Sequence, residues 1–266
     1  MQYKKIPLSV EDDDIFLEVY LPDRVGEQLR PALLAIPGGA YLGVCSDREG
    51  EPIVLSFLPY GFVGFVLHYS VSRKRAFPAQ LLEAVAAIVH IKDNAQAYGI
   101  DPEQVFTVGF SAGGHLAACT GTLWKHPAIC ETLNIPNGYA KPRGMMLIYP
   151  VIKGHFPSFQ NLLCKDDPSA EELEAVQPDK QVDADTVPAF LMHTAADEAV
   201  PVSDSLAMAQ AMAQAGRPFE MHIYPAGPHG IALANSLTSY GDAVLEDEVI
   251  ANWVEQAANW AKKLCQ

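Results

Sequence analysis

A serine stands at the centre of the segment Gly109-Phe110-Ser111-Ala112-Gly113. The G-x-S-x-G spacing is typical of a nucleophilic serine on a tight turn between a strand and a helix. Both neighbours are expected here, because residues 105–108 form a short apolar run and residues 112–124 follow a helical pattern. The glycines let the strand and the helix approach closely, and the helix N-terminus favours negative charge beside the hydroxyl. Ser111 is therefore the candidate nucleophile.

A serine hydroxyl needs a base to take its proton, and histidine suits this task near neutral pH. Of the eight histidines, His229 lies in a Gly-Pro-His-Gly loop after an expected strand, which places it at the same sheet edge as Ser111. His193 and His222 fall inside expected strands, and His115 either lines the site or packs beneath it. The order nucleophile, acid, base along the chain also favours His229 as the base. The histidines with weaker context are His68, His90, His126 and His155.

An acid must orient the histidine ring. Asp197 lies in the loop that follows the expected strand 189–194. There it would accept the ring N–H of His229, fix the tautomer and stabilise the imidazolium. Glu198 is the rival, and Asp204 is a weaker one because it falls within the next expected helix.

The oxyanion of a tetrahedral intermediate needs preorganised N–H donors. One donor would be the backbone N–H of Ala112, directly after the nucleophile. The others would come from Pro37-Gly38-Gly39-Ala40-Tyr41, the loop after the expected strand 32–36. Its glycines allow the backbone to turn N–H groups inward, whereas a plain tight turn is the alternative for this loop.

Short apolar runs alternate with longer helical patterns along the rest of the chain. This alternation predicts an α/β fold with a mostly parallel central sheet and helices on both faces, in three layers. Such a sheet places its active site at the carboxyl ends of the strands. The predicted strands are 16–21, 32–36, 62–71, 105–108, 144–149, 189–194 and 219–224, and the predicted helices are 81–98, 112–124, 202–215 and 242–263.

One segment interrupts the alternation. Residues 151–187 contain three prolines and an acidic helical patch, and they lie between two predicted strands. A stretch this long between elements is either an insertion over the sheet edge, such as a lid, or a surface excursion without a role.

The composition excludes several classes of protein. A chain of 266 residues with 49% apolar residues fits a single domain, residues 1–266, with a sizeable core. The net charge of −14 makes nucleic acids and anionic membranes poor partners. Five cysteines without close pairs argue against a disulfide framework and against a zinc site. No signal core and no bilayer-spanning apolar run is visible, so a cytoplasmic location is expected.

Together these motifs resemble the α/β-hydrolase superfamily, and more narrowly its bacterial esterase/lipase branch, with its acetyl esterases and acetyl-xylan or feruloyl carbohydrate esterases. Relatives in the lipase branch usually carry His-Gly-Gly-Gly at the oxyanion loop, whereas Pro37 and Ala40 replace the first and last residues here. The donors implied by the resemblance map to Gly39 and Ala40, which stay suitable because only backbone N–H groups are used. The resemblance is carried by residues 37–41, 46–52, 69–71, 109–115, 197–201 and 228–230.

The resemblance implies hydrolysis of short acyl esters, with acetyl groups on sugars as the substrate class. This reaction requires no metal and no organic cofactor. Tyr41, Arg48 and Glu51 are candidates for shaping the substrate pocket, and packing or a loop salt bridge is the alternative for each. In the expected reaction a small-molecule ester acylates Ser111. A peptidase or amidase with the same three residues, and a non-catalytic binding protein on this scaffold, are the alternatives. The sequence does not determine whether the protein forms a homo-oligomer.

Overall fold

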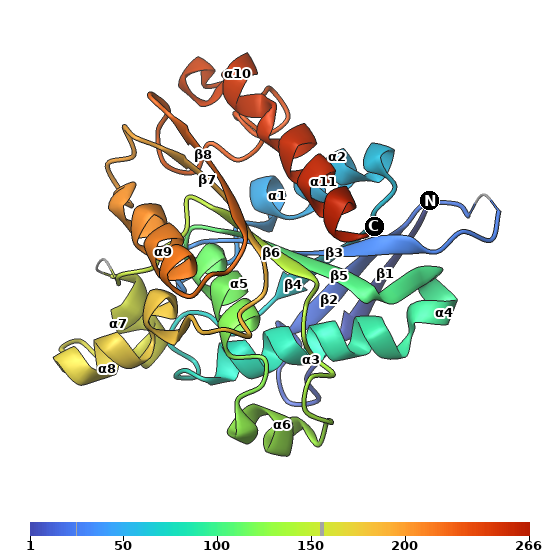
Figure 1. The fold of residues 1–266 in the computed structure, drawn as a ribbon, viewed down its shortest axis with the longest axis horizontal. Helices are drawn as coiled ribbons and strands as arrows, with labels where there is room; N and C mark the ends of the chain where they lie inside the picture. Colours follow the sequence, from blue (N-terminus) through green and yellow to red (C-terminus); the bar gives the residue numbers. More distant parts are fainter. Residues whose placement is uncertain (25, 155–156) are drawn as a thin grey trace.

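A single sheet runs through the computed structural model, which describes residues 1–24, 26–154 and 157–266. Within these residues eight strands follow the order β1-β2-β4-β3-β5-β6-β7-β8 (Figure 1). β2 is antiparallel to β1 and to β4, and all other neighbours are parallel. The strands are β1 (Gln2–Pro7), β2 (Phe16–Leu21), β3 (Arg30–Ile36), β4 (Val63–His68), β5 (Ile100–Phe110), β6 (Gly144–Ile148), β7 (Ala189–Thr194) and β8 (Phe219–Tyr224).

Helices cover both faces of the sheet. One face carries α3 (Ala79–Asp93), α5 (Ala112–Thr122) and α9 (Ser203–Gln214), and the other carries α2 (Glu51–Phe57) and α11 (Trp253–Leu264) (Figure 1). This arrangement confirms the predicted three-layer α/β fold. Among the described residues, no helix combines the length and the apolar character that a membrane span requires. The shorter helices are α1 (Ser46–Glu49), α4 (Ala95–Tyr98), α6 (Pro127–Leu133), α7 (Ser158–Leu163), α8 (Ala170–Ala175) and α10 (Glu248–Ala251), with 3₁₀ turns η1 (Leu58–Tyr60), η2 (Pro178–Gln181) and η3 (Ala243–Leu245).

Leu33 and Leu34 of β3 illustrate how one sheet creates two cores. Successive side chains of a strand point to opposite faces. Leu34 packs in the core under α3 and α5, whereas Leu33 packs in the core that contains Phe57 of α2 and Trp253 of α11. Both leucines are fully buried, and each such burial contributes about 1.5–3 kcal/mol. Burial on both faces explains why this strand reads as an unbroken apolar run.

The predicted strands 16–21, 189–194 and 219–224 coincide with β2, β7 and β8. β5 starts five residues earlier than predicted, at Ile100 rather than Val105, because residues 100–104 continue the strand across an irregular register opposite β3. β1 was not predicted, since it is an edge strand whose residues are nearly all exposed and carry no apolar alternation.

Two predicted helices are interrupted. The helix expected at 81–98 is divided at Asn94 into α3 and α4. The helix expected at 242–263 begins only with α10, where the Asp247 side chain accepts hydrogen bonds from the N–H groups of Val249 and Ile250, and it is divided at Asn252 into α10 and α11. An aspartate in this N-cap position starts a new helix and so separates it from what precedes it.

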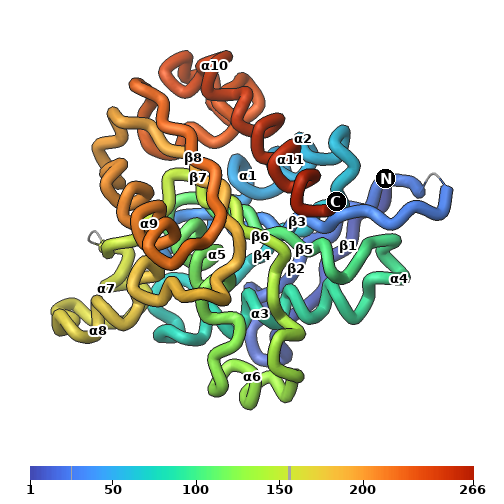
Figure 2. The backbone as a smooth tube through the Cα atoms, in the orientation of Figure 1, coloured from blue at the N-terminus to red at the C-terminus, as the bar shows by residue number. Residues whose placement is uncertain are grey.

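The insertion predicted at 151–187 lies between β6 and β7, and its residues 155 and 156 are outside the described residues. The described part carries α7, α8 and η2, and η2 packs beside α9 (Figure 2). Phe159, Leu162 and Val176 bury their side chains in the core. The Asn161 amide also donates a hydrogen bond of 2.9 Å to the carbonyl oxygen of Ala40. The insertion is thus joined to the loop after β3, and its role as a lid stays a prediction.

Candidate active site

Ser111 occupies the turn between β5 and α5 with φ 52° and ψ −119°. A non-glycine residue in this region of backbone space costs on the order of 1–3 kcal/mol. A Cβ atom on Gly109 would lie 2.2 Å from the carbonyl oxygen of Gly113, and one on Gly113 would lie 2.0 Å from that of Ile36. Only glycine fits these two positions, because the backbones of strand and helix are in contact there. The turn therefore presents the serine hydroxyl at the carboxyl end of β5.

Ser111, His229 and Asp197 form a continuous chain of hydrogen bonds. The distance from Ser111 Oγ to His229 Nε2 is 2.8 Å, and the distance from His229 Nδ1 to Asp197 Oδ2 is 2.7 Å. A carboxylate can only accept, so Nδ1 carries the proton of the neutral ring and Nε2 is free to accept the hydroxyl proton. The structure thus brings the three residues into the order that the sequence predicted.

The carboxylate of Asp197 is fully buried, while the imidazole of His229 is 23% exposed. Asp197 Oδ1 accepts hydrogen bonds of 2.9 Å from the backbone N–H groups of Ala199 and Val200. Burial raises the pKa of the Asp197 carboxyl, but the hydrogen bonds from His193 and His229 outweigh it and hold the pKa well below its usual range. The group is therefore ionised at neutral pH and can stabilise an imidazolium.

The rival acids lie elsewhere. Glu198 is exposed to solvent, beside Asp197 in the chain but not within the core. Asp204 is buried, and its carboxylate accepts hydrogen bonds from the backbone N–H groups of Ile152 and Lys153 at 2.7 and 3.0 Å. Asp204 thus connects α9 to the start of the insertion and is not a partner of His229 in the described structure.

The loop after β3 lies against Ser111. A Cβ atom on Gly38 would be 3.0 Å from the Cβ of Ser111. The N–H of Gly38 is donated to Glu49 Oε2 at 2.8 Å, so this group is already used. Among the described residues, no hydrogen bond from the N–H of Gly39 or Ala40 to another protein atom is present. Gly39, Ala40 and Ala112 stay the proposed donors to an oxyanion.

Two of the three predicted substrate residues are placed otherwise than predicted: Tyr41 packs in the core next to the oxyanion loop, and Glu51 lines a separate hollow. Tyr41 is 1% exposed, and its hydroxyl is 2.6 Å from Nδ1 of the buried His115. Its backbone has a positive φ of 58°, and its ring lies in the core. Glu51 is exposed, but it lines a separate hollow with Tyr3 and Tyr20 at the antiparallel edge of the sheet.

Arg48 is the predicted substrate residue that does lie beside the site. Its guanidinium atoms would be 2.8–3.1 Å from a Cβ placed on Gly230, the residue after His229. The Arg48 side chain is 25% exposed, so it reaches solvent next to the histidine loop. A substrate-binding role for Arg48 stays a prediction.

His115 and His193 belong to the supporting core. His115 Nε2 donates to the carbonyl oxygen of Val176 at 2.7 Å, and burial lowers the pKa of His115 to about 4. His193 Nε2 lies 2.9 Å from the carbonyl oxygen of Val200, and Nδ1 lies 2.7 Å from Ser205 Oγ. Both rings are completely buried, so neither can exchange a proton with substrate.

Two further residues lie at the site although no sequence motif indicates them. Glu49 and Tyr149 are buried next to the oxyanion loop and next to His229. A glutamate in a charged helix and a tyrosine at a strand end are common, so a single sequence carries no signal for their role.

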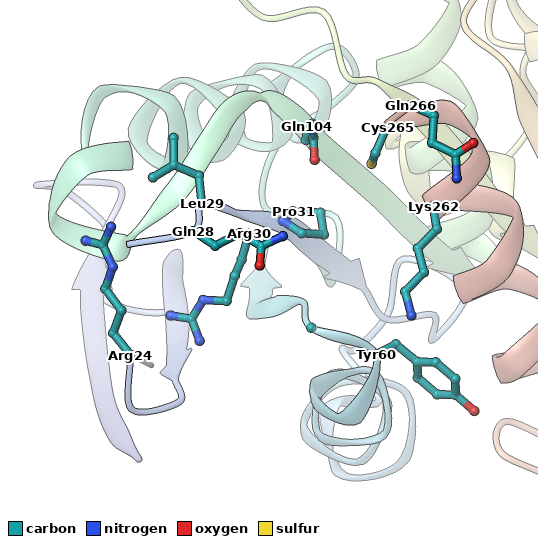
Figure 3. Close-up of a pocket in the computed structure, with 11 residues that line it drawn as sticks. Arg24, Gln28, Leu29, Arg30, Pro31, Tyr60, Gln104, Lys262, Cys265 and Gln266 are labelled. Atoms are coloured by element: carbon teal, nitrogen blue, oxygen red, sulfur yellow. The ribbon is translucent and has the colours of Figure 1, made fainter. Parts of the chain in front are cut away.

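A hollow of about 610 Å³ lies at the opposite end of the sheet (Figure 3). Arg24, Arg30 and Lys262 line it together with polar side chains. Arg30 opens β3, whereas Ser111 follows the carboxyl end of the neighbouring β5. None of the proposed site residues lines this hollow, so we do not assign it to the active site.

Two family models match the chain, BD-FAE over residues 17–142 and the prolyl oligopeptidase family over residues 83–263. The chain is 28% identical to an acetylxylan esterase of Xylanibacter ruminicola, over 95% of this chain and 50% of that protein. The chain spans a third to about half of the length of the first curated relatives that it matches.

Solved structures match over nearly their whole length. An α/β-hydrolase enzyme from a deep-sea metagenome library is 32% identical, with a TM-score of 0.82 over 99% of this chain and 98% of that one. An acetyl ester-xyloside bifunctional hydrolase from Caldicellulosiruptor lactoaceticus is 30% identical, with a TM-score of 0.82 over 98% and 96%. The chain therefore belongs to the α/β-hydrolase superfamily, and its residues 83–263 match the prolyl oligopeptidase family.

Proposed function

We propose that the chain is a serine carboxylic ester hydrolase that removes short acyl groups, above all acetyl, from sugar-bearing alcohols. The observation that carries the proposal is the hydrogen-bonded chain from Ser111 through His229 to Asp197, with distances of 2.8 and 2.7 Å. The first distance lies within the range needed for proton transfer from nucleophile to base, and the second allows Asp197 to orient the ring.

The reaction follows from the chemistry of these groups. Ser111 attacks the ester carbonyl as His229 takes the hydroxyl proton, and the negative oxygen is stabilised by the N–H groups of Ala112, Gly39 and Ala40. The imidazolium, stabilised by Asp197, then protonates the leaving alcohol. Water repeats the sequence on the acyl-enzyme and releases the acid. Every proton is moved by the described residues.

The proposed preference for acetyl groups and for sugar alcohols is based on the names of related proteins. A relative of similar length is named an acetyl ester-xyloside hydrolase, and a longer one is named an acetylxylan esterase. We therefore expect release of acetate from acetylated xylo-oligosaccharides, and faster turnover of nitrophenyl acetate than of longer nitrophenyl esters. Acetate release no faster than in buffer would refute the carbohydrate assignment.

The nucleophile is tested with Ser111→Ala. We expect ester turnover to fall by about 10⁴-fold or more, because the acyl-enzyme cannot form. Ser236→Ala, a change at an exposed serine, serves as the matched control. Circular dichroism and thermal unfolding verify that both variants fold. Near-normal turnover by folded Ser111→Ala would exclude the proposed mechanism.

A peptidase or amidase is the second candidate, favoured by the match of the prolyl oligopeptidase family over residues 83–263. The same three residues could attack an amide. Assays on nitrophenyl acetate and on aminoacyl nitroanilides, compared by kcat/KM, separate the two activities. A fluorophosphonate probe that failed to label Ser111 would instead favour the non-catalytic alternative.

A further inference from the structure

A buried carboxylate lies between the two loops that the proposed reaction uses. Glu49 is the last residue of α1, and it is 1% exposed. Its Oε2 accepts the hydrogen bond of 2.8 Å from the Gly38 N–H, and its Oε1 accepts one of 3.0 Å from the Tyr149 hydroxyl. A carboxylate with one oxygen on each of two different segments fixes the distance between them.

Tyr149 extends this connection to the histidine loop. Its hydroxyl oxygen accepts a hydrogen bond of 3.1 Å from the Ala232 N–H, three residues after His229. Its ring lies edge-on to the imidazole of His229, with centroids 5.1 Å apart and an interplanar angle of 67°. Tyr149 is thus both a hydrogen-bonded support for the loop and a wall for the ring of the proposed base.

Because the carboxylate of Glu49 is buried, its hydrogen-bond and charge partners must compensate for the loss of water. Burial raises the pKa of Glu49, whereas Arg48, the Gly38 N–H and the Tyr149 hydroxyl counteract it. The Arg48 Nε atom lies 3.7 Å from Oε1. A buried carboxylate without such partners would be strongly disfavoured, so its presence argues for a task that an apolar side chain cannot perform.

We propose that Glu49 is a positioning residue, which holds the oxyanion loop and the His229 loop in register through Gly38 and Tyr149. It is buried and does not touch substrate. By using the N–H of Gly38, it leaves the next two N–H groups, of Gly39 and Ala40, for the oxyanion. The proposal rests on the proposed hydrolase function.

Glu49→Gln tests the carboxylate with little change of shape. Its amide can accept from Gly38 but then presents NH₂ to Tyr149 and Arg48, both of which need an acceptor. We expect kcat for nitrophenyl acetate to fall about 100-fold with KM within about threefold, because a misplacement near 1 Å costs about this factor. Glu255→Gln, the same change at an exposed position of α11, is the matched control and keeps wild-type kcat.

Tyr149→Phe tests the second connection and keeps the ring against His229. We expect about a tenfold loss of kcat, and the double variant with Glu49→Gln should lose less than the product of the two single losses. This variant also keeps the proposal testable if Glu49→Gln does not fold.

A boronic acid that bonds to Ser111 reports the positioning itself, because it mimics the tetrahedral intermediate. Its affinity should fall with kcat/KM across the variants, whereas a merely structural role would lower the melting temperature and leave the affinity of the folded fraction unchanged. Wild-type kcat in both folded variants, or unchanged boronate affinity, overturns the proposal. The proposed function fails separately, if Ser111→Ala retains turnover.

Discussion

Replacing Asp197 with asparagine separates the charge of the acid from its shape. The two backbone N–H groups of Ala199 and Val200 need an acceptor at 2.9 Å, so the asparagine oxygen takes the place of Oδ1. The NH₂ group then faces His229 Nδ1, where the carboxylate oxygen lies at 2.7 Å. As a donor it stabilises the tautomer whose proton is on Nε2, which cannot accept the proton of Ser111.

The expected loss follows from this inverted tautomer. A wrong tautomer together with loss of the carboxylate that stabilises the imidazolium lowers kcat by about 10⁴-fold in a triad of this kind. That factor corresponds to about 5.4 kcal/mol of transition-state stabilisation. KM should change little, because Asp197 is buried away from substrate.

The assay is steady-state hydrolysis of nitrophenyl acetate by folded protein, with Ser111→Ala setting the background. Glu198→Gln is the matched control and also tests the rival acid, since Glu198 is exposed one residue away. A loss of less than tenfold in Asp197→Asn, or a larger loss in Glu198→Gln, would refute the assignment of the acid.

Two further predictions concern the supporting structure. Gly113→Ala should destabilise the fold by about 3 kcal/mol in urea unfolding, because its new methyl would lie 2.0 Å from the Ile36 carbonyl oxygen. Gly43→Ala, where a Cβ meets nothing within 4 Å, should stay within about 0.5 kcal/mol, and equal effects would contradict the close-contact argument. The free energy of unfolding should also fall as pH drops from 6.5 toward about 4, since His115 has a pKa lowered to about 4 in the fold and takes up a proton on unfolding. His115→Gln should flatten this slope relative to wild type, and an unchanged slope would assign it to other groups.

The three reacting residues could be predicted because each follows a strand of a parallel sheet. Ser111 follows β5, Asp197 follows β7 and His229 follows β8, and the carboxyl ends of such strands share one edge. β7 and the second half of β5 are buried on both faces, so their sequences read as apolar runs. β8 is an edge strand in which only Tyr224 is buried, and its run of strand-forming residues after Gly216 and Pro218 made it predictable.

Side-chain direction beyond the motifs could not be predicted. Tyr41 follows the glycines of the oxyanion loop, yet its backbone has a positive φ and its ring is buried in the core. Arg48, Glu49 and Glu51 are neighbours in a charged segment, but Arg48 lies beside the histidine loop, Glu49 is buried, and Glu51 lines a hollow beside β1 and β2. Short helices such as α1 carry too few residues for a period to indicate which side is inside.

The insertion after β6 has a consequence for exchanging parts between relatives. Its Val176 carbonyl receives the N–H of His115, four residues after the nucleophile, and its Asn161 amide binds the carbonyl of Ala40. A segment grafted here from another hydrolase would need an acceptor and a donor at the same two points. Without them, the ring beneath the serine turn would keep an unsatisfied proton in a dry interior, so a change of substrate range by segment swapping would also disturb the reacting centre.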